Sequence, residues 1–235
     1  MSLIKTTPTT NRLLAALPAR DHQRFMASCE HVELVFGEVL AEPGERIRHV
    51  YFPTDSFISL TTPVGGTTSL EVGMAGSEGM LGVSLILGIP ISPMHAVVQG
   101  SGPTLRLPVL HFRRQLELSN PLLRLLKRYL FVVIGQLAQA SACTRFHVVE
   151  ARLARWLLMT QDRAHSAQFH LTHEFLASML GVRRVGVTKA ATSLQQRKLI
   201  YYRRGEITIL DRKGLEKAAC ACYASDRATY AGMLD

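Results

Sequence analysis

Cysteine is scarce in this chain of 235 residues, which has only four. Cys29, Cys143, Cys220 and Cys222 are too scattered for a disulfide framework, and no Cys-x-x-Cys pair is present. We therefore expect free thiols. Cys220 and Cys222 are candidate oxidant sensors, but two such positions on one continuous helix point to different faces and would bond poorly.

A long hydrophobic run is also missing. The most apolar stretch, residues 129–135, directly follows Lys127 and Arg128, whereas a membrane span needs about 18 or more apolar residues in a row. The first twenty residues contain only the short apolar run 13–17, which is shorter than the centre of a secretory signal. We expect a cytoplasmic protein that has no membrane partner.

Motifs typical of enzymes are absent as well. The sequence has no Gly-x-Ser-x-Gly, no Gly-x4-Gly-Lys and no His-Glu-x-x-His. His165, His170 and His173 are close in sequence, but three histidines leading into a helix are more often solvated than metal-bound. His95 is a candidate haem ligand in an apolar stretch, although a core or rim histidine is more frequent. The expectation is a non-enzyme with no metal and no cofactor.

Basic residues are abundant and unevenly placed. Residues 1–150 carry 13 Lys/Arg and 11 Asp/Glu, a charge of +2, whereas residues 151–235 carry 14 and 7, a charge of +7. Lysine and arginine release counterions when they neutralise phosphates, so this asymmetry suggests that the C-terminal part meets a polyanion. A solubilising surface explains the charge equally well.

The hydrophobic period changes twice along the chain. After a threonine-rich leader and a helical segment (11–30), short alternating runs punctuated by glycine and proline predict strands up to about Leu110. From Pro121 to about Arg145 a helical period takes over, with an apolar stripe in heptad steps. The stripe, which we expect to face a partner subunit's helix, comprises Leu123, Leu126, Leu130, Val133, Leu137 and Ala140.

The segment from His173 to Thr192 is the most specific signal in the sequence. Gly181 suits the turn between two crossing helices, and Thr172 suits an N-cap. Around it we predict helices over 148–161, 172–180 and 183–197, a hairpin over 199–210 and a last helix from about Asp211. This is the order of a helix-turn-helix followed by a wing.

In a helix-turn-helix, the second helix enters the major groove of DNA. Arg184 is the candidate for bidentate contact with guanine, and Arg183 and the wing-tip residues Arg203 and Arg204 are better placed for phosphate. The predicted base-reading residues are Arg184, Val185 and Lys189. The predicted phosphate contacts are Thr172, Arg183, Thr188, Ser193, Arg203 and Arg204.

Taken together, these segments resemble the Crp/Fnr family of bacterial transcription regulators. The resemblance rests on Pro43-Gly44, residues 50–53 (VYFP), residues 76–82 (GSEGMLG) and residues 171–200. It implies an α+β fold, with an N-terminal antiparallel β-roll or jelly-roll sensor domain (1–119) like a cyclic-nucleotide-binding domain, a dimerisation helix (120–147) and a winged helix-turn-helix (148–235). It also implies homodimers on palindromic double-stranded DNA, with RNA polymerase as a further expected partner.

The sequence departs from the family where a cyclic nucleotide would bind. Val83 follows Gly82 where cyclic-nucleotide binders have glutamate, and the later segment 93–96 (PMHA) lacks their Arg-Ser pair. A cyclic phosphate would therefore meet no positive partner, so we do not expect control by cyclic AMP. Val185 also replaces the family's DNA-reading glutamate, so the operator should differ. Residues of an effector pocket, for an effector still unknown, are Leu81, Gly82, Val83, Leu85, Met94 and His95.

One alternative stays open at this point. The chain could be a haem- or redox-responsive sensor or interaction module whose basic C-terminal region binds an acidic partner other than DNA. Loss of operator binding on Arg184→Ala, with retention on neutralising surface lysines elsewhere, would separate the two hypotheses.

Overall fold

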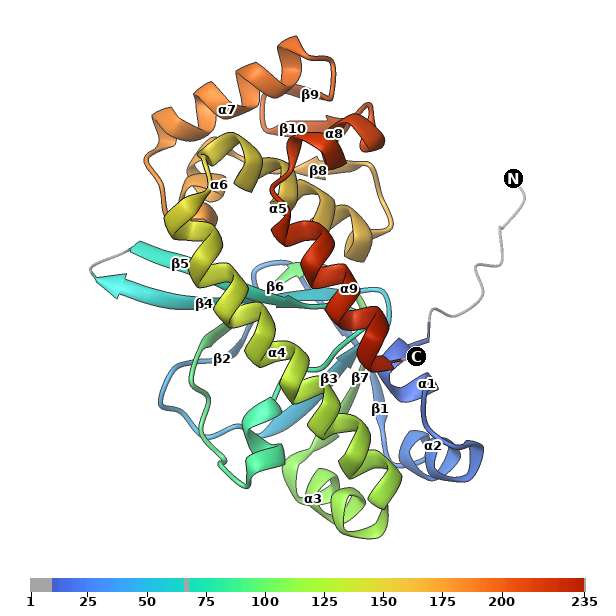
Figure 1. The fold of residues 1–235 in the computed structure, drawn as a ribbon. Helices are drawn as coiled ribbons and strands as arrows, with labels where there is room; N and C mark the ends of the chain where they lie inside the picture. Colours follow the sequence, from blue (N-terminus) through green and yellow to red (C-terminus); the bar gives the residue numbers. More distant parts are fainter. Residues whose placement is uncertain (1–9, 66–67, 235) are drawn as a thin grey trace, which may run out of the picture. The chain divides into compact units, whose positions relative to one another are not determined.

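A computed structural model of the chain describes residues 10–65 and 68–234, so the threonine-rich leader (1–9) lies outside the described residues. The chain forms two units, drawn in Figure 1. The first comprises Met1–Leu60, Met74–Phe131 and Met233–Asp235, and the second Thr61–Gly73 and Val132–Gly232. This division differs from the expected segments 1–119, 120–147 and 148–235, because both units share the long helix and one β-hairpin.

Short strands make up most of the first unit, as the alternating pattern predicts. A three-stranded sheet has the order β1-β7-β3 and is antiparallel, and a four-stranded sheet has the order β2-β6-β4-β5. The fold class, α+β with antiparallel sheets, is confirmed. The elements that begin or lie in this unit are α1 (Arg12–Ala15), α2 (Ala19–Met26), β1 (Glu30–Leu34), β2 (Val39–Ala41), β3 (His49–Pro53), β4 (Phe57–Gly65), β5 (Thr68–Ala75), η1 (Val83–Leu87), β6 (His95–Gly100), β7 (Gly102–Pro108) and α3 (Val109–Leu118).

The core of the first unit is apolar and aromatic. Phe52 on β3 is fully buried, and its ring meets Phe25 edge-on at 5.3 Å and Phe112 at 6.4 Å between centroids. Aromatic pairs in these geometries add to the stabilisation that comes from burial alone. The strands β3 and β7 therefore present their inward residues to the helices α2 and α3.

Two glycines of the segment 76–82 are required by packing. A Cβ on Gly79 would lie 2.2 Å from the hydroxyl of Tyr129, and Gly82 has φ +104°, a left-handed conformation that favours glycine. Tyr129 is buried and its hydroxyl donates to the carbonyl of Met80 at 3.4 Å. These glycines thus let the segment lie against the N-terminal half of the long helix.

Helices dominate the second unit. The long helix α4 (Asn120–Phe146) has nearly the predicted bounds and crosses from one unit into the other. No helix of the described ranges is long and apolar enough to cross a membrane. The remaining elements are α5 (Val149–Ala164), β8 (Gln168–His170), α6 (His173–Leu180), α7 (Arg184–Gln196), β9 (Ile200–Arg203), β10 (Glu206–Ile209), α8 (Arg212–Ala218) and α9 (Cys222–Leu234).

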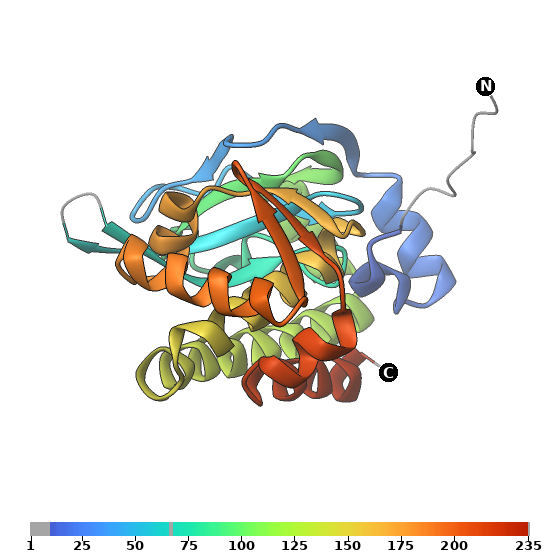
Figure 2. The ribbon, with the colours of Figure 1, turned by 90° about the horizontal axis from the view of Figure 1, so that it is seen from above.

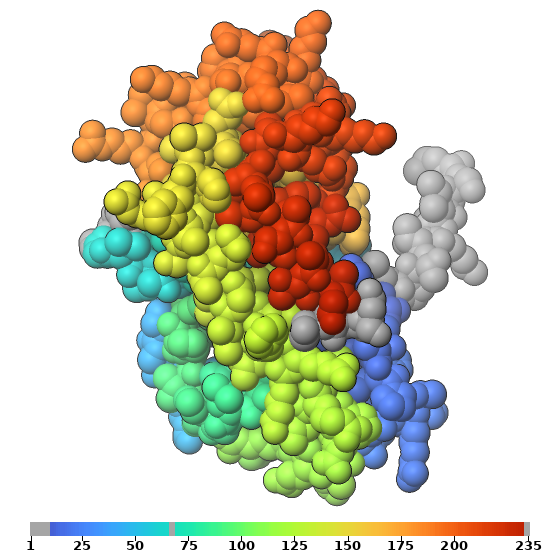
Figure 3. All heavy atoms as spheres, in the orientation of Figure 1, coloured from blue at the N-terminus to red at the C-terminus, as the bar shows by residue number. Residues whose placement is uncertain are grey.

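The C-terminal region corrects one prediction. Instead of a single helix from Asp211, two helices are separated at residues 219–221. Figures 1 and 3 show α9 (red) lying against the C-terminal half of α4 (yellow), where the hydroxyl of Ser225 hydrogen-bonds Gln139 at 3.5 Å. The break allows Cys220 and Cys222 both to be buried, which one continuous helix would place on different faces.

Candidate nucleic-acid interface

The helix-turn-helix has the predicted geometry. Thr172 is the N-cap of α6, and its hydroxyl oxygen accepts from the Phe175 amide at 3.1 Å. Gly181 ends α6 with φ +59°, in the left-handed conformation that the turn requires. A Cβ there would also lie 2.8 Å from Cδ1 of Leu70 on β5, so a side chain at this turn would displace the end of Leu70.

Helix α7 has one buried and one exposed face. Val187, Ala190, Ala191 and Leu194 are buried against the rest of the unit. Arg184, Val185, Thr188 and Lys189 are all exposed, and Val185 is 60% accessible although it is apolar. Ser193, a predicted phosphate contact, is half-buried between the two faces. The residues predicted to read bases therefore share the open face.

The wing is a three-stranded antiparallel sheet with the order β8-β10-β9. Arg203 pairs with Glu206, so Arg204 and Gly205 form a two-residue turn with φ of +52° and +87°. Positive φ at both positions is the requirement of a type I′ hairpin turn. The predicted hairpin is confirmed, whereas β8 was not predicted because its three residues are too few to show a period.

Figure 2 shows α7 and the β9–β10 hairpin side by side on one face of the second unit. The amide of Tyr202 on β9 donates to the side chain of Gln195 on α7 at 2.6 Å. We refer to the exposed cations Arg183, Arg184, Lys189, Arg203 and Arg204 as the basic set. Among the described residues, no carboxylate forms an ion pair with any of them. These charges are therefore available to an anionic partner.

His173 links three elements of this region and was not predicted to do so. Its Nδ1 lies 3.0 Å from the Thr188 hydroxyl on α7, and its ring stacks on Tyr202 of β9 at 4.3 Å between centroids. Burial, with the nearby charge of Arg184, lowers the pKa of His173 below its usual value. His173 thus braces the N-terminus of α6 against α7 and the wing.

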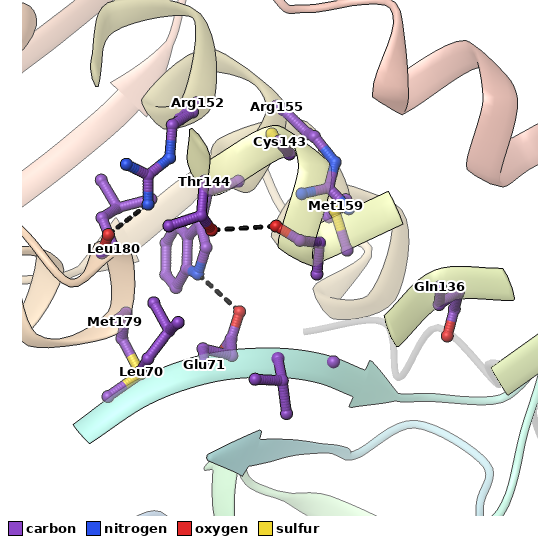
Figure 4. A pocket seen from close by; sticks show the side chains of 14 residues that line it. Leu70, Glu71, Gln136, Cys143, Thr144, Arg152, Arg155, Met159, Met179 and Leu180 are labelled. Atoms are coloured by element: carbon purple, nitrogen blue, oxygen red, sulfur yellow. Dashed lines mark hydrogen bonds between the residues drawn. The ribbon is translucent and has the colours of Figure 1, made fainter. Parts of the chain in front are cut away.

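A pocket behind the helix-turn-helix holds a buried arginine that sequence reasoning missed (Figure 4). The guanidinium of Arg152 on α5 donates to the carbonyl of Leu180, at the C-terminus of α6. The indole of Trp156 donates to Glu71 on β5 at 2.8 Å. Arg152 supplies a donor to a helix-end carbonyl that lacks one within the helix, and so positions α6 on α5.

The predicted effector residues lie in the first unit, in and around the 3-10 helix η1 and at the start of β6. Residues 83–87 form a 3-10 helix, in which Leu85 is buried and Val83 half-buried. Leu81 and Gly82 are buried, and Met94 is half-buried. The Nε2 of His95 lies 3.6 Å from the Glu42 carboxylate. An effector pocket at these six residues stays a prediction.

The predicted dimer stripe is only partly open to solvent. Leu126 and Val133 are buried within the chain, at 0% and 7% exposure. The large apolar residues exposed on α4 are Phe131 and Ile134, at 58% and 57%, and the terminal Phe146, at 78%. Phe131 and Ile134 each follow a member of the predicted stripe by one residue, and the stripe itself stays a prediction. The other predicted members, Leu123, Leu130, Leu137 and Ala140, are half-buried.

Comparison with known proteins agrees with this geometry. Residues 151–218 match the Crp-like helix-turn-helix domain family. No curated protein matches the chain as a whole or in part.

Solved structures share the fold at low identity. FixK2 from Bradyrhizobium japonicum is 13% identical at a TM-score of 0.69, covering 82% of this chain and 98% of that one. A Crp/Fnr-family regulator from Eubacterium rectale is 16% identical at a TM-score of 0.69, covering 88% of this chain and 96% of that one. A second regulator of that description, from Thermus thermophilus, is 22% identical at a TM-score of 0.65, covering 81% of this chain and 98% of that one. These likenesses confirm the expected fold, and the family match confirms the Crp-like helix-turn-helix domain.

Proposed function

We propose that this chain acts as a homodimeric, sequence-specific DNA-binding transcription regulator that does not respond to cyclic AMP. It has a Crp-like helix-turn-helix domain within the fold of the Crp/Fnr regulators. The observation that carries the proposal is the exposed face of α7, where Arg184, Val185 and Lys189 lie beside unpaired cations of the basic set.

On DNA, each residue has a distinct role. Arg184, near the N-terminus of α7, donates two hydrogen bonds to the O6 and N7 of a guanine, and Val185 contacts a thymine methyl group. Arg183 at the N-cap and Arg203 at the wing contact phosphates, which fix the register without reading sequence. Specificity is thus concentrated in the first turns of α7.

The test is selection of bound sequences from random double-stranded DNA, followed by affinity measurements on the selected and on scrambled sites. We expect Arg184→Ala to weaken selected-site binding by about 1–3 kcal/mol and to relax one base position. Arg203→Ala should weaken both sites alike and lower the salt slope by about one. Arg114→Ala, an exposed cation of the first unit, is the control and should change neither. Equal losses on both sites for Arg184→Ala would contradict its base-reading role.

For the dimer, the proposed interface is the exposed apolar stripe of α4 that contains Phe131 and Ile134, which we call the seam. Phe131 and Ile134 are spaced as in a heptad, and Ala138 continues the same steps. Ile134→Asp should place carboxylates in the seam and give monomers by sedimentation, whereas Leu87→Asp, at an equally exposed apolar position of the first unit, should remain dimeric. If the Ile134→Asp protein remained dimeric, the dimer interface would lie elsewhere on the chain.

Cyclic AMP independence is supported by the interior of the first unit. Its buried polar side chains, among the described residues, are neutral hydroxyls and amides, so no buried guanidinium is available for a cyclic phosphate. Calorimetry with cyclic AMP and cyclic GMP should show no binding at micromolar concentrations. Tight binding of either nucleotide would refute this part of the proposal.

A further inference from the structure

Four side chains with metal-ligating atoms converge in the second unit, outside the proposed DNA-contacting face. Cys143 lies near the end of α4 and His147 just follows that helix, while Cys220 precedes α9 and Cys222 begins it. Their ligand atoms, three Sγ and one imidazole nitrogen, all lie within 4.8 Å of one another. The sequence gives no hint of this group, because Cys-x3-His and Cys-x-Cys are far apart along the chain.

The distances fit a tetrahedral ion. The Sγ atoms of Cys143 and Cys220 are 3.5 Å apart, and Cys222 Sγ lies 3.4 Å from His147 Nδ1. Zinc bonded to sulfur at about 2.3 Å and to nitrogen at about 2.0–2.1 Å would set ligand atoms roughly 3.6–3.8 Å apart. The two measured edges are close to these values, so small side-chain movements would complete the polyhedron.

The surroundings suit a closed, negatively charged site. Cys143 and Cys222 are each 2% exposed and Cys220 is 8% exposed. The side-chain amide of Gln139 donates to Cys222 Sγ at 2.9 Å, as outer hydrogen-bond donors do to metal-bound thiolates.

Positive charge also lies near the sulfurs. The side chains of Arg152 and Arg155 line the same pocket as Cys143. Three thiolates and a neutral imidazole around Zn²⁺ leave a net charge of about −1, which the guanidinium of Arg152 offsets, whereas that of Arg155 pairs with Asp226.

We propose that Cys143, His147, Cys220 and Cys222 bind one Zn²⁺ per chain, joining the end of α4 to the turn between α8 and α9. Binding forms three Zn–S bonds and one Zn–N bond and releases the three thiol protons to solvent. Four protein ligands leave no open position, so the ion is structural and not catalytic. The proposal does not depend on DNA binding, since none of its ligands belongs to the basic set.

The test uses the full-length chain, kept reduced, with its metal content measured after purification without chelators. We expect one zinc per chain. After removal of zinc, titration with Co²⁺ under anaerobic conditions should saturate at one equivalent and give the intense visible bands of tetrahedral, thiolate-bound cobalt. Zinc should then displace the cobalt and raise the Tm above that of the metal-free protein.

Matched variants assign the ligands. Cys143→Ser and Cys220→Ser should weaken Co²⁺ binding more than about 100-fold, which exceeds the range of about 10–100-fold for outer-sphere effects. Cys29→Ser, which removes the cysteine of the first unit, should bind like wild type. His147→Cys keeps four ligands, so it should retain the ion with stronger sulfur-to-cobalt charge transfer, which guards against a variant that merely fails to fold.

Three outcomes would overturn the proposal. The first is reduced wild-type protein that binds neither zinc nor cobalt. The second is a Cys143–Cys220 disulfide found by mass spectrometry in place of the metal, which would make the cluster a redox pair. The third is a loss of cobalt binding in Cys29→Ser equal to that in Cys143→Ser.

Discussion

The two units bury different kinds of polar group. In the first, the described buried polar residues are neutral, such as Asn11, Ser59 and Gln99. In the second, Arg152, Arg163 and Asp226 are buried together with three cysteines. Both units have a hydrophobic core, so the difference lies in how each satisfies its buried polar atoms.

The physical reason is the secondary structure. Strands satisfy their backbone groups through neighbouring strands, whereas each helix ends with carbonyls that have no partner within the helix. Arg152 donates to such a carbonyl at Leu180. Arg163 donates to the carbonyl of Met159, four residues earlier within α5, at 3.0 Å. Arg155 pairs with Asp226 at 2.5 Å. The helical unit should therefore respond to charge and pH, and the β-rich unit mainly to side-chain volume.

The largest expected effect is a cavity in the first unit. Phe52→Ala removes a fully buried ring that contacts Phe25 and Phe112, and should lower the free energy of unfolding by about 3–5 kcal/mol. Urea unfolding followed by far-ultraviolet circular dichroism measures this. Phe36→Ala is the control, since Phe36 is 57% exposed and its loss should cost less than about 0.5 kcal/mol. Equal losses in the two variants would show that packing does not dominate this unit.

A smaller effect is expected from Arg152→Met in the second unit. The variant leaves the Leu180 carbonyl without its donor, but it also removes a desolvated charge, so the free energy of unfolding should fall by about 1–2 kcal/mol. Fluorescence of Trp156, the single tryptophan, reports on this unit. Arg197→Met breaks only an exposed ion pair with Glu150 and should change little. An Arg152→Met protein as stable as wild type would remove the proposed contrast between the units.

The smallest effect concerns pH. The folded protein lowers the pKa of His173, mainly by burial, so His173 stabilises the fold above its ordinary pKa of about 6.5. That contribution is lost as the pH falls from there toward the lower folded pKa. When unfolding is followed by the fluorescence of Trp156, His173→Gln should reduce the fall of Tm with decreasing pH on the acid side.

A matched variant in the first unit sharpens this test. Burial also lowers the pKa of His49 on β3. His49→Gln should therefore flatten the pH dependence of the Tm measured by circular dichroism of the β-sheets. The pH dependence of the Tm measured by Trp156 fluorescence should stay unchanged. If His49→Gln altered the Trp156 signal as strongly as His173→Gln, the titrations would not be local to each unit.

Much of the second unit was predictable because its signals are local in sequence. Helix α4, the Thr172 cap, the left-handed Gly181 and the turn at Arg204-Gly205 each depend on residues within a few positions of one another. Helical period, capping chemistry and the conformational freedom of glycine are properties of short segments.

Other features depend on contacts between distant segments. The exposed seam of α4 contains Phe131 and Ile134 because Leu126 and Val133 are already buried in the chain, which a heptad pattern cannot reveal. The break between α8 and α9 has no proline or glycine to mark it, and it exists where Cys220 and Cys222 meet Cys143.

The sequence by itself thus determined the order of the elements, the helix-turn-helix and the wing, because these follow from short-range periodicity and turn chemistry. Only the tertiary structure decided which side of α4 is open, how Arg152 supports α6, and that Cys143, His147, Cys220 and Cys222 form one cluster. Each of these depends on atoms brought within a few ångströms by folding, and spacing along the chain carries no record of such distances.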